Sequence, residues 1–172
     1  MVDWRYREAI DKFHNKLRQR VAWGEAVVNG RDLGPEREMY GLIYDCALEW
    51  EANYEIKLPG YADLFHRGLV RFTSEFKGSG LSALEKALKT LYDDENSVRQ
   101  LIYPKATRFG CRGTAGKAEK AGHQKMEWVC VYDKKPTEEE NLEGGSYCNE
   151  NKDCTYYKGS TCKSELCYTY YV

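Results

Sequence analysis

Apolar residues recur with helical spacing near the start of the chain, and this pattern predicts two helices. The first runs from Tyr6 to about Val28, stops at Asn29-Gly30, and has an apolar face of Ile10, Phe13, Leu17 and Val21. The second begins at Pro35, which suits a first helical position, and runs to about Ile56. Its apolar stripe is Met39, Ile43, Cys46, Ala47 and Trp50.

A third amphipathic pattern follows a break at Leu58-Pro59-Gly60 and a short helix or loop over 61–70. It predicts a helix from Leu81 to about Asp94, capped by Ser79 or Ser82, with leucines on one face at 81, 84, 88 and 91.

Two apolar runs separated by a polar, glycine-containing loop then predict antiparallel strands. They lie between Asn96 and Cys111 and between Glu127 and Tyr132. Each run carries a cysteine near the end that faces the loop. Cys111 and Cys130 could therefore form a disulfide between neighbouring strands.

Composition narrows the class of protein. A chain of 172 residues is long enough for one domain, or one domain with a small appendage. The net charge is −1, and acidic and basic residues are mixed, which argues against a nucleic-acid partner. No apolar run approaches the roughly 20 residues that span a bilayer, so no membrane span is expected.

The cysteines indicate the compartment. Four of the seven lie in the last 25 residues, at positions 148, 154, 162 and 167. This segment has too few aliphatic residues for a core of its own, and it has no C-x2-C pair and no nearby histidine to suggest zinc. We therefore expect disulfides, and with them a secreted, extracellular protein.

Four motifs resemble one family. They are Phe13-His14-Asn15-Lys16-Leu17-Arg18, Met39 to Glu49, Gln100 to Cys111 and Val129 to Tyr132. Together they resemble the CAP superfamily, and most of all the activation-associated secreted and venom-allergen-like proteins of parasitic nematodes. The resemblance implies an α+β fold, in which a small antiparallel sheet lies between helical layers in an α-β-α sandwich. We expect a divergent CAP domain over 1–135, a linker over 136–147 and a cysteine-rich tail over 148–172.

Disulfide pairing in the tail follows from the same resemblance. It implies Cys148–Cys162 and Cys154–Cys167, whereas the sequence alone allows three pairings of four cysteines. Three cysteines then remain. The strand argument favours Cys111–Cys130 and leaves Cys46 unpaired, and Cys46–Cys130 is the alternative.

The resemblance also implies a cleft with two histidines and two acidic residues, which many members use to hold a divalent metal. Ser97 stands where one histidine is expected, and Asp94 aligns with one acid. One alignment of the remaining stretch recovers Glu75 and His66, and another loses both. One histidine and two acids would hold a metal weakly, so we predict no metal, no cofactor and no catalytic group. His14 is expected to be structural.

We therefore predict a secreted, non-enzymatic binding protein at a host–parasite interface. The resemblance implies that it occludes a host receptor, integrin or immune factor. The tail is rich in tyrosine, which either contacts a protein partner or packs the tail onto the domain. The alternative is a carrier of a small apolar ligand, a sterol or fatty acid. A residual metal-dependent hydrolase is third.

Overall fold

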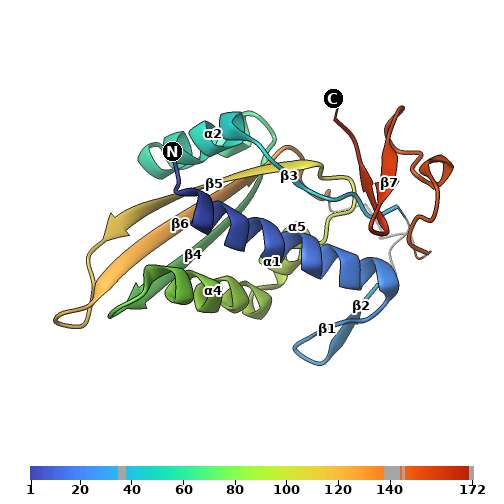
Figure 1. Cartoon of the computed structure of the whole chain (residues 1–172). Coiled ribbons are helices and arrows are strands. Elements are labelled where there is room, and N and C mark those ends of the chain that lie inside the picture. Colours follow the sequence, from blue (N-terminus) through green and yellow to red (C-terminus); the bar gives the residue numbers. More distant parts are fainter. Residues whose placement is uncertain (35–37, 138–143, 145, 171–172) are drawn as a thin grey trace.

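A four-stranded sheet lies between two helical layers in the computed structural model, which describes residues 1–34, 38–137, 144 and 146–170 (Figure 1). The strand order is β3-β5-β6-β4. The helix α2 covers one face, and α1, α4 and α5 lie on the other. This is the predicted α-β-α sandwich. The bounds of these elements are α1 Trp4–Trp23, α2 Cys46–Lys57, α4 Gly80–Thr90, α5 Glu95–Leu101, β3 Ile43–Tyr44, β4 Gly68–Phe76, β5 Arg108–Gly116 and β6 Gln124–Tyr132.

The sheet is mixed rather than wholly antiparallel. Strands β5 and β4 each pair with β6 in the antiparallel sense, whereas the two-residue strand β3 runs parallel to β5. The smaller elements are the hairpin of β1 (Ala26–Val28) and β2 (Arg31–Leu33), the helix α3 (Tyr61–Leu64), the 3-10 turns η1 (Leu91–Asp93) and η2 (Asn151–Asp153), and the tail hairpin of β7 (Thr161–Lys163) and β8 (Leu166–Tyr168).

The first helix ends earlier than predicted. Gly24 adopts a left-handed conformation with φ of 72° and closes α1 at Trp23. Residues 26–33 then form the β1–β2 hairpin. Its turn is Asn29-Gly30, where both residues have positive φ, a dipeptide that favours a tight hairpin turn. The dipeptide that we interpreted as a helix stop is therefore a turn between two strands.

The second helix is half as long as predicted, and the predicted stripe is wrong. It begins at Cys46, because the Asp45 side chain accepts a hydrogen bond from the Ala47 amide and acts as the N-cap. Residues 38–44 are not helical, and Pro35 lies outside the described residues. The helix buries Leu48, Ala52 and two glutamates against the sheet, which leaves Cys46, Ala47 and Trp50 exposed.

The predicted strand that starts near Asn96 is also wrong in its first part. The Asp94 side chain accepts a hydrogen bond from the Ser97 amide at 2.8 Å and so caps α5, which runs to Leu101. The strand itself begins only at Arg108. The preceding helix, α4, has the predicted Ser79 cap and buries the predicted leucines 84 and 88, with Leu91 buried in the turn that follows.

A long strand in the middle of the chain was also missed. Residues 61–70 were predicted as a short helix or loop, but β4 starts at Gly68 and continues to Phe76. Val70, Phe72 and Ser74 are buried, while Arg71 and Thr73 are exposed. This alternation with a period of two is typical of a strand that has one face in the core.

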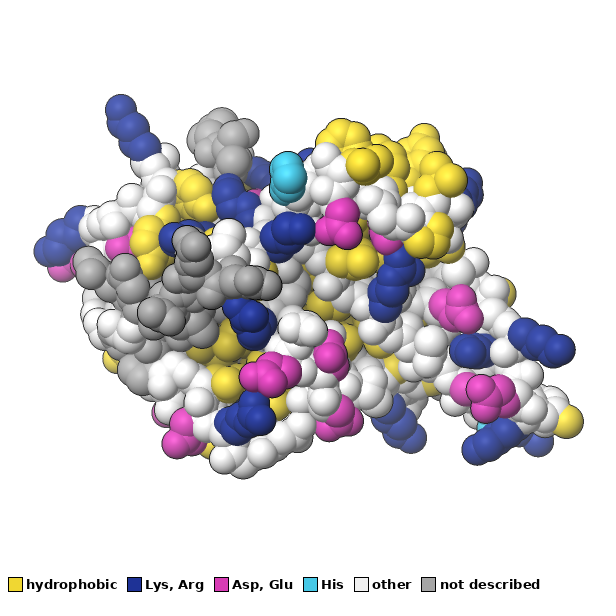
Figure 2. Space-filling view, turned by 180° about the vertical axis from the view of Figure 1, so that it is seen from behind, with side chains coloured by type: hydrophobic (Ala, Val, Ile, Leu, Met, Phe, Trp, Pro, Cys, Tyr) yellow, Lys and Arg dark blue, Asp and Glu magenta, His cyan; other side chains and the backbone are white. Residues whose placement is uncertain are grey.

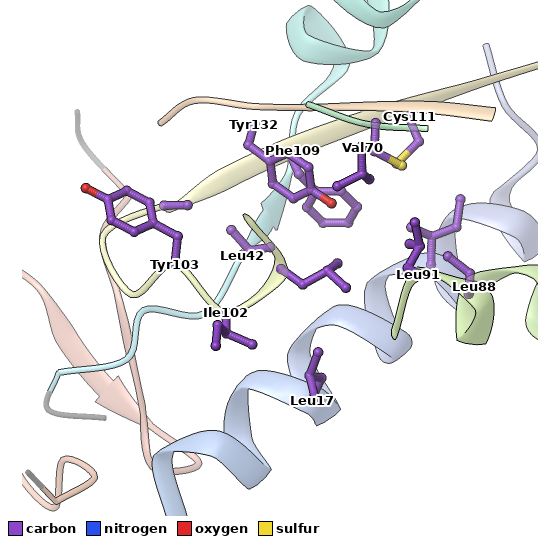
Figure 3. Packing of buried hydrophobic residues seen from close by; sticks show 14 of the residues in the cluster. Leu17, Leu42, Val70, Leu88, Leu91, Ile102, Tyr103, Phe109, Cys111 and Tyr132 are labelled. Carbon is purple, nitrogen blue, oxygen red and sulfur yellow. A yellow bond between two sulfur atoms is a disulfide. The ribbon is translucent and has the colours of Figure 1, made fainter. Parts of the chain in front are cut away.

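The main core lies between the sheet and the α1 layer. Figure 3 shows Leu17, Leu88 and Leu91 from the helical side opposite Phe109 and Cys111 of the sheet. Cys111 and Cys130 are directly opposite each other in the β5–β6 pairing and form a disulfide there, as the strand argument favoured. Cys46 is the free cysteine.

Two buried polar side chains connect α1 to the rest of the core. The Arg18 guanidinium donates hydrogen bonds to the backbone carbonyls of residues 40, 101, 103, 104 and 106. His14 contacts the Ile10 carbonyl through Nδ1 and the Tyr132 hydroxyl through Nε2. The motif around Phe13 to Arg18 therefore has a structural role, as expected for His14.

The tail folds back onto the domain. Its disulfides are Cys148–Cys162 and Cys154–Cys167, the pairing that the resemblance implied. Cys167 exchanges backbone hydrogen bonds with both sides of Tyr40, from its amide to the Met39 carbonyl at 2.9 Å and from the Gly41 amide to its carbonyl at 2.8 Å. Tyr40 is fully buried against the tail cysteines.

Candidate functional site

Two of the cleft candidates, His66 and Glu75, lie at opposite ends of β4. His66 precedes the strand and Glu75 lies near its far end. Seven residues of extended chain from Gly68 to Glu75 span about 23 Å, so the two side chains cannot share an ion. His66 is exposed after α3, with a φ of 53°. The alignment that recovers His66 and Glu75 therefore does not reconstitute a four-residue site.

Asp94 and Ser97 do lie together. Both line a cavity of about 490 Å³ that also contacts Arg71, Glu127 and Trp128. Hydrogen bonds from Ser97 hold the pKa of Asp94 below its usual value, because they stabilise the carboxylate. The Asp94 carboxylate already accepts hydrogen bonds as the cap of α5. Ser97 has no imidazole that could bind a metal.

Glu75 lies in a second cavity, of about 510 Å³, between the end of β4 and α4. Its carboxylate accepts hydrogen bonds from the Lys120 amide at 2.8 Å and the Glu119 amide at 3.1 Å, which lower its pKa. The Nδ1 atom of His123 lies 3.9 Å from Oε1 of Glu75. Glu75 thus fixes the loop between β5 and β6.

Within the described residues, only one cluster of three donor side chains could surround a metal ion: Cys148, Cys154 and Cys167. All three sulfurs are in disulfides, which removes them as thiolate ligands. The candidates His66, Glu75, Asp94 and Ser97 are thus not brought together as a metal site in the described part of the chain.

An exposed aromatic surface lies elsewhere, on α2 and α3. We call it the aromatic patch and define it as Trp50, Tyr54, Leu58, Tyr61, Leu64 and Phe65. Tyr61 stacks on Tyr54 with ring centroids 5.3 Å apart and contacts Phe65 at 5.1 Å, so the rings form a continuous row. Figure 2 shows hydrophobic side chains gathered over these elements at the top of the molecule.

Exposure sets this patch apart from ordinary surface residues. Trp50 is 60% exposed, Phe65 is 52% exposed and Leu64 is 75% exposed. Clustered, exposed apolar side chains of this size mark interaction surfaces more often than isolated ones do. The ion pairs Arg67–Glu51 and Lys135–Asp63 involve residues of α2 and α3 beside the patch.

The tyrosines of the tail mostly pack inward. Tyr156 stacks on Tyr40, and Tyr157 contacts the same ring edge-on and donates to the Lys105 carbonyl. Tyr147 and Tyr170 remain exposed, and Tyr171 lies outside the described residues. Of the two interpretations of the tail, packing onto the domain accounts for more of its tyrosines.

Sequence reasoning missed the aromatic patch for one reason. It extended the second helix back to Pro35 and so assigned Trp50 to the buried stripe. A helix that begins at Cys46 buries Leu48 and Ala52 instead, and carries apolar residues on both faces. The signal that could have revealed this is Asp45, which has the side chain of a good N-cap.

No family model matches the sequence. The chain is 27% identical over 184 residues to the Ancylostoma secreted protein of Ancylostoma caninum, covering 94% of this chain but only 42% of that protein. Among solved structures, it is 60% identical to Ancylostoma-secreted protein Ac-ASP-7, with a TM-score of 0.86 and coverage of 99% of this chain and 92% of the other.

The chain therefore belongs to the nematode Ancylostoma-secreted proteins of the CAP superfamily. A manganese-bound form of Ac-ASP-7 is equally similar, with 60% identity, a TM-score of 0.86, and coverage of 100% of this chain and 93% of the other. The predicted membership of the nematode Ancylostoma-secreted and venom-allergen-like CAP proteins is thus confirmed. In the described part of the chain, no helix combines the length and the apolar character needed to cross a membrane.

Proposed function

We propose that this CAP protein is secreted, has no catalytic activity, and binds a host protein at the interface between parasite and host. Its relatives are named as secreted proteins, and three disulfides suit an oxidising extracellular setting. The partner class is a host receptor, integrin or immune factor, whose surface the protein occludes.

The aromatic patch is the observation that carries this proposal. Tryptophan and tyrosine are enriched at the energetic centres of protein interfaces. Here Trp50 and the Tyr54-Tyr61-Phe65 row are held on two short, adjacent helices, so little side-chain freedom is lost on binding. The mechanism is steric: the patch covers a functional surface of the partner.

Manganese is named for a similar structure, and we infer no role for it here. Glu75 and His123 are a carboxylate and an imidazole 3.9 Å apart, which are ligand types that manganese accepts. The carboxylate already accepts two backbone hydrogen bonds, and the described residues place no third histidine, cysteine or carboxylate beside this pair. The dispersed cleft residues likewise give little support to a metal-dependent hydrolase.

Transport of a sterol or fatty acid has less support than protein binding. The cavity beside Asp94 includes Ile56, Phe72 and Trp128, but Arg71 and Glu127 line it too. A carrier pocket for an apolar ligand is mostly apolar. Organic extraction of the purified protein, followed by mass spectrometry, should therefore yield no stoichiometric lipid.

The test of the main proposal starts with capture of host plasma and cell-surface proteins on the immobilised protein. The captured protein is identified, purified and titrated against the variants Trp50→Ala and Phe65→Ala. Each should weaken the affinity about tenfold or more, the loss expected for a residue at the centre of an interface. Tyr170→Ala is the matched control, because this tyrosine is 55% exposed and lies in the tail.

Equal affinity of the patch variants and the control would reject the patch as the binding surface. Near-equal unfolding temperatures of all three variants are required for the comparison, and they are expected because the three side chains are exposed.

A further inference from the structure

The outer edge of β4 is open. This strand is the last in the order β3-β5-β6-β4, and β6 is its neighbour in the sheet. Its pairing with β6 runs without a bulge from Gly68 opposite Tyr132 to Phe76 opposite Gln124. Among the described residues, no backbone group outside β6 hydrogen-bonds to the backbone of β4. Alternate residues therefore present unpaired N–H and C=O groups outward.

Natural sheets protect such an edge with proline, a bulge, a short strand, charged side chains or a covering helix or loop. β4 has no proline and no bulge, but it carries Arg71 and Glu75, and α4 lies beside its C-terminal half. The strand is nine residues long, against an average strand of about five or six residues. An edge of this length with regular backbone geometry is a template for another extended strand.

A groove follows the same edge. The cavity of about 510 Å³ has β4 residues Thr73 to Phe76 on one side and the flank of α4 on the other. Ser82, Ala83 and Ala87 line the α4 side, and these small side chains leave room for a backbone beside the strand. The cavity that contains Asp94 continues along β4 and shares Thr73 and Thr90 with the first.

The charged residues that line the groove predict the orientation of a bound strand. Lys77 and Lys86 line the end of the groove where β4 finishes, and neither forms an ion pair within the described residues. The acidic group there, Glu75, is already bound to two backbone amides. Antiparallel pairing is the commoner kind, and it would place the N-terminal half of an added strand beside these lysines.

We propose that the β4 edge and the α4 groove bind an extended polypeptide segment as an additional antiparallel strand. The segment carries acidic side chains in its N-terminal half, where they meet Lys77 and Lys86. The backbone of β4 supplies the hydrogen bonds, and the small residues of α4 accept alternate side chains. This surface is separate from the aromatic patch and does not depend on the function proposed for it.

The probe is a synthetic nonapeptide of alternating threonine and valine, with two aspartates near its N-terminus. Two further versions carry backbone N-methyl groups on alternate residues, in the two possible phases. A strand added to an edge uses only one set of alternate amides, so one methylated peptide should bind like the parent and the other should not bind. Titration calorimetry on the full chain measures each affinity.

Single substitutions in α4 test whether the peptide binds in the groove. Ala83→Tyr fills the groove and should abolish binding, whereas Glu85→Tyr, on the same helix but outside the groove, should not. Lys86→Ala should weaken the parent peptide about two- to fivefold, the value of one exposed ion pair, and Lys89→Ala should leave it unchanged. Binding should also slow amide hydrogen exchange at alternate residues of β4.

Absence of saturable binding up to about 1 mM peptide would overturn the proposal. Equal effects of the two methylation phases would also overturn it, because they would exclude strand pairing. Trp50→Ala should leave peptide binding intact, so failure of this site and failure of the aromatic patch give different results.

Discussion

At the scale of single residues, buried polar groups of α1 account for the motif that first suggested the family. Arg18 is fully buried and donates only to backbone carbonyls. Burial lowers its pKa to about 10, which still leaves it charged at neutral pH. A planar guanidinium carries five N–H donors in a fixed fork, whereas a lysine ammonium has three. The motif therefore holds the loops 40–42 and 101–106 against α1.

His14 makes the stability of the protein sensitive to pH. Burial lowers its pKa from 6.5 to about 4, and the charge of Arg18 adds to the effect. The unfolded chain takes up a proton on this imidazole as pH falls below 6.5, and the folded chain does so only near pH 4. The free energy of unfolding should therefore fall by about 2–3 kcal/mol between pH 7 and pH 4.5.

Urea unfolding at the two pH values measures this difference. His14→Gln should be less stable at pH 7, because it disrupts the contact with Tyr132, but it should lose most of the pH dependence in this window. Carboxyl groups such as Asp94, whose pKa is lowered, contribute at more acidic pH, where they become protonated. An unchanged slope in the variant would assign the effect to another group.

At the scale of elements, the start of α2 decides which residues face solvent. The helix is capped by Asp45, and it buries Glu49 and Glu55 rather than Trp50. Glu49 accepts hydrogen bonds from Arg7 and from the Tyr44 hydroxyl, both at 2.8 Å. Glu55 is paired with Arg71 and accepts the Ala62 amide. These polar contacts hold α2 on the sheet and leave its aromatic side chains outward.

The same boundary exposes Cys46 at the first turn of α2. We expect one reactive thiol per chain in a titration with a disulfide reagent under native, non-reducing conditions, and none in Cys46→Ser. Because the other six cysteines are in disulfides, denaturation should not raise the count. A thiol that persists in Cys46→Ser would show that at least one of the three disulfides is not formed.

At the scale of the whole molecule, the tail and the domain form one packing unit. Cys167 bonds to the backbone around Tyr40, and Gln19 of α1 donates to the Ser164 carbonyl. Tyr40 also donates to Ser160, inside the tail. The tail therefore contributes to the core around Tyr40.

Removal of one tail disulfide tests this coupling. The double variant Cys154→Ser/Cys167→Ser removes a disulfide that closes a loop of 13 residues. The free energy of unfolding should fall by about 3 kcal/mol, and the unfolding temperature should fall by roughly 6–12 °C. Scanning calorimetry should show a single transition for the native chain, shifted as a whole in the variant. A second transition, with the main one unchanged, would mean that the tail folds independently.

Features that depend on local pattern could be predicted from the order of residues alone. Short-range periodicity predicted the buried faces of α1 and α4 and the strands that become β5 and β6. It favoured the Cys111–Cys130 disulfide over Cys46–Cys130, and the register of the two strands settled that choice. Family resemblance added the sandwich and the tail pairing. Asp94 was identified as a candidate residue, but its role as the cap of α5 was not.

Other features depend on contacts between segments that are distant in the sequence. The start of α2 at Cys46 reflects the Asp45 cap together with the pairing of β3 with β5, which draws residues 43–44 into the sheet. Whether His66 and Glu75 meet depends on β4, which separates them because an extended chain is long for its residue count. The aromatic patch and the open edge of β4 likewise exist only because the sheet and helices bury other residues. Exposure is a property of the assembled layers, and no single segment encodes it.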